Sequence, residues 1–135
     1  MVGMVGNFGP LVEPLRQRCG TLHVLERHPS VNSGMLPESA ASEVLPQCQV
    51  VILSASTLLK RTLDALLEFC RSAREVVILG PSTPLLPDAF ATRGPTLLSG
   101  VYVAHPERVL RIVSEGGGTR QFGAAVRKLT VRLAR

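Results

Sequence analysis

Polar residues stand directly after short apolar runs in this sequence. Asn7 lies between two glycines after residues 2–5, and Glu26 and His28 follow the mostly apolar segment 21–25. Carboxylate, imidazole and amide groups are the side chains that bind metal ions and polar ligands. Their common position after apolar runs predicts a binding surface built from loops.

Hydroxyl-bearing loops follow two further apolar runs, residues 49–54 and 75–79. The loop residues are Ser56, Thr57, Pro81, Ser82 and Thr83. Proline stiffens the second loop, so its hydroxyls would be held near a ligand, although either could instead cap a helical turn. No paired histidine and acid marks a hydroxyl as a nucleophile, so we expect binding rather than nucleophilic catalysis.

Direct binding of a metal ion by side chains of this chain is the more specific hypothesis. Glu26, His28 and His105 each follow an apolar run and would serve as ligands of a divalent transition metal if the fold brings them together. The spacing does not demand this, because a lone histidine is more often an ordinary surface or core residue. The three cysteines lack the paired spacing of structural zinc sites, and we expect reduced thiols.

The first loop matches a dinucleotide-binding fingerprint only in part. Gly6 and Gly9 have the GxxG spacing and Glu26 lies twenty residues beyond Gly6, but Met4 stands where the first glycine would be. This disfavours simple NAD binding. Asn7 either caps the following helix or contacts a ligand, and the two roles are compatible.

Apolar runs alternate with segments of helical periodicity along the chain. The expected strands are 2–5, 21–26, 49–54, 75–79 and 96–103, and the main expected helices are 11–18, 59–72 and 106–114. This alternation predicts an α/β fold with a doubly wound, mostly parallel sheet of five strands and helices on both faces. A last helix is expected from Thr119, with Phe122, Val126, Leu129 and Leu133 on one stripe.

Composition narrows the class of partner. The chain has 135 residues, enough for one core, with 45% apolar and only 4% aromatic residues, which suits nucleic-acid stacking poorly. Apolar runs are too short to cross a membrane and no secretory leader is visible, so a cytoplasmic location is expected. The basic residues 120, 127, 128, 132 and 135 form a solvated face or an interaction surface.

Six sequence blocks together resemble one known family. They are GNFGP at 6–10, LERHP at 25–29, VVILSASTL at 50–58, LGPSTPLLP at 79–87, LSGVYV at 98–103 and EGGGTRQF at 115–122. They resemble the Rossmann-like domain of the putative heavy-metal chelation family. The resemblance implies a site in a cleft against a preceding, smaller enolase-like domain, and a link to metal handling, including anaerobic cobalamin synthesis.

The resemblance implies that the residues at the matching positions contact the ligand. They are Asn7, Phe8, Gly9, Glu26, Ser56, Thr57, Pro81, Ser82 and Thr83. Because the sequence starts close to its first strand, we expect residues 1–135 to form a single Rossmann-like domain without the enolase-like one. A partner domain or a second copy would then complete the cleft.

The sequence therefore predicts a domain that binds a heavy metal, a metal chelate or another small polar ligand where its strands end. Two alternatives stay open. One is an enzyme of metal-tetrapyrrole or related cofactor metabolism that is active only with a partner domain. The other is a protein-interaction module that uses the basic C-terminal helix.

Overall fold

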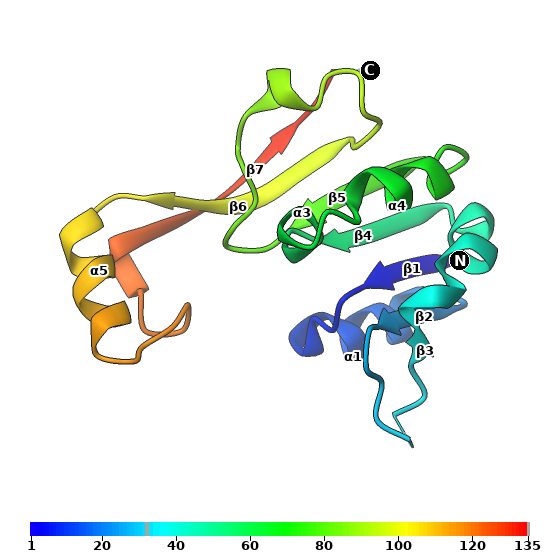
Figure 1. Ribbon diagram of the computed structural model, residues 1–135, viewed down its shortest axis with the longest axis horizontal. Coiled ribbons are helices and arrows are strands. Elements are labelled where there is room, and N and C mark those ends of the chain that lie inside the picture. The colour runs from blue at the N-terminus through cyan, green and yellow to red at the C-terminus, as the bar shows by residue number, and fades with distance from the viewer. Residues whose placement is uncertain (32, 135) are drawn as a thin grey trace.

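The computed structural model describes residues 1–31 and 33–134, and it has an α/β fold built on a seven-stranded sheet (Figure 1). The strands are β1 (Val2–Val5), β2 (Leu22–Glu26), β3 (Leu36–Pro37), β4 (Val50–Ser54), β5 (Glu75–Leu79), β6 (Leu97–Val103) and β7 (Val126–Arg132). Their order in the sheet is β3-β2-β1-β4-β5-β6-β7, and every neighbouring pair is parallel except β6 and β7. The predicted α/β class and mostly parallel sheet are confirmed.

Helices connect the parallel strands. They are α1 (Gly9–Arg18), α2 (Ala41–Val44), α3 (Ser56–Leu59), α4 (Leu63–Phe69) and α5 (Pro106–Ser114), with short 3-10 turns η1 (Glu38–Ala40), η2 (Leu45–Gln47), η3 (Pro87–Ala89) and η4 (Gly123–Ala125). Pro10 falls in the first turn of α1, where its missing N–H group lacks an intrahelical partner in any case. In the described part of the chain, no helix combines the length and apolarity needed to span a membrane.

The centre of the sheet is buried on both faces. Strand side chains alternate between faces, and the register sets Met4 beside Ile52 and Val5 beside Leu53. Met4, Ile52 and Val24 pack with side chains of α1, whereas Val5 and Leu53 belong to the larger cluster with side chains of α4. Burial on both faces holds the carboxyl ends of these strands in fixed positions.

The sheet has seven strands rather than the five predicted. One additional strand, β3, contains only two residues. Leu36 pairs with Leu25, and Pro37 pairs with Glu26. A two-residue strand has no periodicity of its own, so the sequence pattern could not indicate it.

The helix predicted from Thr119 onward is wrong, because the chain there forms the antiparallel strand β7. The apolar stripe fits helical spacing, but Leu129, Val131 and Leu133 also alternate as in a strand. Val131 pairs with Leu98, and Leu133 joins the main core cluster. Arg127, Lys128 and Arg132 therefore lie on a strand instead of a helix, and Arg120 lies in a turn before it. Arg135 lies outside the described residues.

The helix predicted over 59–72 is interrupted. The chain turns between α3 and α4 at Arg61, which has a φ of 57°. Side chains other than glycine rarely adopt this left-handed conformation, and tertiary packing must support it. The break places Lys60 and Thr62 on a connection that lines a cavity at the surface.

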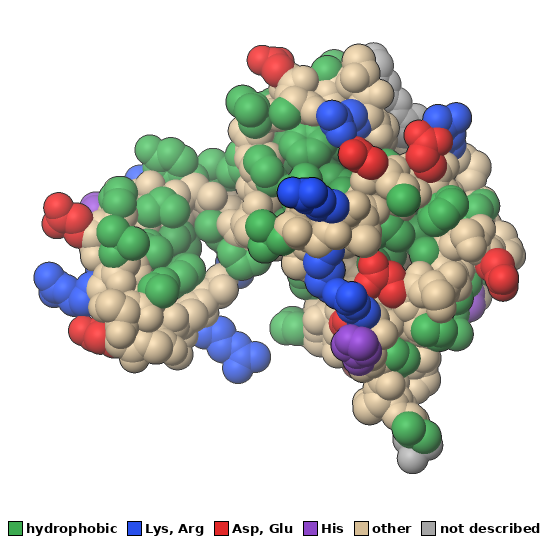
Figure 2. Space-filling model, viewed as in Figure 1, with side chains coloured by type: hydrophobic (Ala, Val, Ile, Leu, Met, Phe, Trp, Pro, Cys, Tyr) green, Lys and Arg blue, Asp and Glu red, His purple; other side chains and the backbone are tan. Residues whose placement is uncertain are grey.

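Strands β6 and β7 extend beyond the sheet as an arm that carries α5 (Figure 1). Only Leu97–Ser99 of β6 pair with β5, whereas the rest of β6 pairs with β7 alone. No residue of α5 is buried, and Leu110 is 69% exposed. Figure 2 shows hydrophobic side chains uncovered on this lobe.

Candidate ligand site at the carboxyl ends of the strands

Gly6 brings the loop after β1 against the end of β4. Its φ is +95°, and a Cβ atom at this position would lie 2.8 Å from the Cβ of Ser54. The Gly6 N–H donates to the carbonyl of Leu25 at 2.8 Å, which ties the same loop to β2. In the sheet β1 lies between β2 and β4, so the strand order reverses here, and open α/β sheets bind ligands at such points.

Glu26 braces the start of α1 from the end of β2. One carboxylate oxygen accepts the N–H of Asn7 at 3.1 Å, and the other accepts the N–H of Arg27 at 2.9 Å. The N-cap residue of α1 is Phe8, and no side chain caps this helix. Asn7 is therefore not the capping residue, and its exposed side chain is available to a ligand.

The loop after β4 contains a pair of hydroxyls. The Oγ atoms of Ser54 and Ser56 are 2.9 Å apart. Thr57 is buried, and its hydroxyl donates to the carbonyl of Ser54 at 2.6 Å, so it supports the loop. Ser54 was not among the predicted contacts, although its place as the last residue of β4 could have indicated it.

The loop after β5 lies beside the β4 loop. The N–H of Ala55 donates to the carbonyl of Leu79 at 2.9 Å. Thr83 is buried against Gly100, and its hydroxyl has no hydrogen-bond partner among the described residues. Pro81 and Ser82 are exposed on the same loop. The ends of β1, β2, β4 and β5 thus form one continuous edge with most of the predicted contacts.

Phe8 and Gly9 have different surroundings from those expected of ligand contacts. Phe8 is partly buried and packs against the cluster of Met4, Val24 and Ile52. Gly9 is exposed at the start of α1, and a Cβ atom there would meet nothing within 4 Å. Phe8 therefore contributes packing, and no close backbone approach requires glycine at position 9.

The structure does not bring Glu26, His28 and His105 together. His28 lines a cavity beside the end of β2, whereas His105 precedes α5 on the projecting arm and lines a separate depression there. Within residues 1–31 and 33–134 there is no group of three or more His, Cys, Asp or Glu side chains that could hold a metal ion. The separation arises because β6 leaves the sheet after Ser99, paired only with β7.

Burial keeps two of the cysteine thiols protonated. It raises the pKa of Cys70 to about 12, with a further contribution from the neighbouring Cys48, and it also raises the pKa of Cys48. The Cys70 thiol donates to the carbonyl of Leu66 at 3.0 Å. Because the thiolate is the form that binds metals, these two side chains are core residues rather than ligands.

Alkaline pH should weaken the fold through Cys70. The unfolded state loses the thiol proton near the ordinary pKa of 9.0, whereas the folded state keeps it up to about 12. The free energy of unfolding should therefore fall between these limits as the pH rises, by at most about 1.4 kcal/mol per pH unit from this thiol. Urea unfolding at several pH values should show that the free energy of unfolding falls less steeply with pH in Cys70→Ala than in the native chain. Equal slopes in the two proteins would contradict a raised pKa of Cys70.

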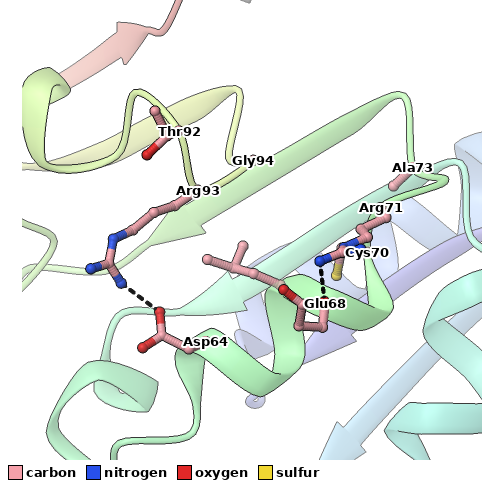
Figure 3. Close-up of a pocket in the computed structure, with 9 residues that line it drawn as sticks. Asp64, Glu68, Cys70, Arg71, Ala73, Thr92, Arg93 and Gly94 are labelled. Atoms are coloured by element: carbon pink, nitrogen blue, oxygen red, sulfur yellow. Dashed lines mark hydrogen bonds and ion pairs between the residues drawn. The ribbon is translucent and has the colours of Figure 1, made fainter.

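Another cavity lies at the opposite edge of the sheet, where strands begin (Figure 3). It measures about 760 Å³ and is lined by α4 and by the segments before β5 and β6. Its charged side chains pair with one another. Arg93 contacts Asp64 at 2.6 Å, and Arg71 contacts Glu68 at 2.5 Å. These pairs leave little unsatisfied charge for a ligand.

Comparison with known proteins assigns the chain to a family. The family model described as "Putative heavy-metal chelation" matches residues 1–132. An uncharacterized protein of Methanocaldococcus jannaschii is 28% identical over 134 residues, which cover 98% of this chain and 52% of that protein. The chain thus spans about half the length of this curated relative.

Two solved structures have the same fold, and both are described as DUF364 proteins of unknown function. The one from Desulfitobacterium hafniense is 35% identical with a TM-score of 0.84, covering 97% of this chain and 52% of that one. The one from Pyrococcus horikoshii is 26% identical with a TM-score of 0.90, covering 98% and 54%. The chain therefore belongs to the putative heavy-metal chelation family, DUF364.

Proposed function

We propose that this chain is a Rossmann-like, doubly wound domain that binds a small polar ligand or a metal chelate at the carboxyl ends of β1, β4 and β5. The observation that carries the proposal is the close approach of Gly6 to Ser54, which leaves no room for a Cβ atom at position 6, where the strand order reverses. The order β3-β2-β1-β4-β5-β6 is also that of dinucleotide-binding sheets. The description of the family supports a ligand that contains a heavy metal.

Polar groups at this edge suit a ligand with several oxygen or nitrogen atoms. Ser54 and Ser56 offer two adjacent hydroxyls, and the amide of Asn7 lies on the neighbouring loop. Ser82 adds an exposed hydroxyl after β5. Hydroxyls and amides both donate and accept hydrogen bonds, so they can bind donor groups as well as acceptor groups of a chelate.

The donor set does not fit a bare heavy-metal ion held by this chain alone. Both oxygens of the Glu26 carboxylate accept backbone N–H groups, and the thiols of Cys48 and Cys70 are buried and protonated. We therefore propose that the metal, when present, is cargo whose donors belong to the chelating molecule or to a part of the protein beyond these residues. Residues 1–135 would then form one domain whose cleft a partner domain or a second copy completes.

Calorimetric titration tests this proposal. The probes are cobalt, nickel and zinc ions and their citrate chelates, added to metal-stripped protein. We expect saturable binding of a chelate near one equivalent, weakened about fivefold in Ser56→Ala, because one hydrogen bond contributes about 1 kcal/mol. Ser114→Ala is the matched control, since its hydroxyl lies on the arm, where it donates to the carbonyl of Arg111. The proposal fails if no probe binds, or if both variants bind as tightly as the native chain.

A further inference from the structure

A second cavity lies beside the end of β2. It measures about 610 Å³, within the range of small-molecule pockets, and is bounded by the segment after β2, by η1 and α2, and by the connection between α3 and α4. Arg27, His28 and Lys60 line it together with Glu38. On the face drawn in Figure 2, basic, acidic and histidine side chains lie close together below the position of α3.

The charges of this cavity are unpaired, in contrast to those of the larger cavity. In the part of the chain that the structure describes, no ion pair or side-chain hydrogen bond involves the guanidinium of Arg27, the ammonium of Lys60 or the carboxylate of Glu38. Two cations therefore face one carboxylate, and the cavity carries a net positive charge. A concave surface of one sign attracts and concentrates ligands of the opposite sign.

The rest of the lining is apolar with one buried hydroxyl. Leu66 and Phe69 of α4 contribute hydrophobic surface, and Ala41 of α2 is buried beside them. Thr62 also lines the cavity, and its buried hydroxyl has no partner among the described residues. A hydrophobic wall with a few convergent polar groups is typical of sites for small organic molecules.

We propose that this cavity binds a small organic anion, a carboxylate or phosphate ester with an apolar body. Arg27 and Lys60 hold the anionic group, the apolar body packs on Phe69 and Leu66, and Glu38 disfavours ligands with a higher negative charge. An Arg guanidinium binds carboxylate and phosphate oxygens in a bidentate manner. None of these residues belongs to the chelate site proposed above, so the two sites are tested separately.

Binding of phenyl phosphate, measured by calorimetry, tests the proposal, with benzyl alcohol as the neutral probe. We expect phenyl phosphate to bind and benzyl alcohol to bind at least tenfold more weakly. Lys60→Met should weaken phenyl phosphate about tenfold, whereas Glu38→Gln should strengthen it severalfold, because the two changes alter the charge in opposite directions. A general loss of folding would weaken binding in both variants, whereas binding in this cavity predicts that the affinity changes in opposite directions.

Lys128→Met on β7 is the matched control, because it removes the same charge outside this cavity. Thermal unfolding of each variant verifies that the chain is folded. The proposal is overturned if Lys60→Met and Lys128→Met weaken phenyl phosphate equally, if Glu38→Gln weakens it, or if benzyl alcohol binds as tightly. Ser56→Ala should leave this binding unchanged, so failure of the chelate site and failure of this site give different results.

Discussion

Gly6→Ala is expected to lower the free energy of unfolding by about 3 kcal/mol. The new Cβ would need a φ near +95° and would lie 2.8 Å from the Cβ of Ser54. A left-handed conformation costs on the order of 1–3 kcal/mol for residues other than glycine, and overpacking costs roughly the same. Because the change also pushes the β1 loop away from β4, we expect chelate binding to fall at least tenfold. Urea unfolding and calorimetric titration measure the two effects.

Gly9→Ala is the matched control for this prediction. Gly9 begins α1, and a Cβ atom there meets nothing within 4 Å. Alanine has a higher helix propensity than glycine, so stability should stay the same or rise slightly. Equal destabilisation by the two substitutions would show that the contact between Gly6 and Ser54 does not shape the site.

Glu26→Ala should lower the free energy of unfolding by about 2 kcal/mol. The carboxylate accepts the N–H groups of Asn7 and Arg27, and hydrogen bonds to a charged acceptor contribute roughly 1.5–3 kcal/mol each when buried and less when partly exposed, as here. Without this brace, the Asn7 loop loses its fixed position at the crevice. We therefore expect weaker chelate binding together with a lower urea midpoint.

Two further variants separate the effect of the hydrogen bonds to Glu26 from a general effect of removing a negative charge. Glu26→Gln keeps one carbonyl acceptor, so it should lose about half as much stability as Glu26→Ala. Glu13→Ala removes an exposed carboxylate of α1 that accepts a hydrogen bond from the side chain of Gln17 at 3.2 Å, and it should have little effect. If Glu26→Ala were no more harmful than Glu13→Ala, the proposed brace would be wrong.

The sequence predicted the parallel part of the fold because that part follows strong local patterns. Unbroken apolar runs such as Val50–Leu53 are typical of strands covered on both faces, and β4 lies there. The C-terminal strand was mistaken for a helix, because its apolar residues satisfy both periods. Pairing of β7 with β6 and burial of Leu133 in the core favour the strand, and neither is visible in the sequence.

The candidate site was predictable to a similar degree. Loops after parallel strands must meet at one edge, so Asn7, Glu26 and Ser56 could be named from their positions alone. The separation of His105 depends on where β6 leaves the sheet, which sequence spacing does not determine. Lys60 joins the second cavity only because the chain breaks at Arg61, and a periodic helical pattern concealed that break.

Amide chemical-shift mapping tests the central claim most directly. The measurement is a titration of ¹⁵N-labelled, metal-stripped protein with the chelate that gives the largest calorimetric heat. We predict shifts concentrated in the loops after β1, β4 and β5, at residues 6–8 and 54–56 and at Gly80 and Ser82, with α5 unaffected. Shifts confined to the arm around His105, or no shifts at saturating concentration, would contradict ligand binding at the carboxyl ends of the strands.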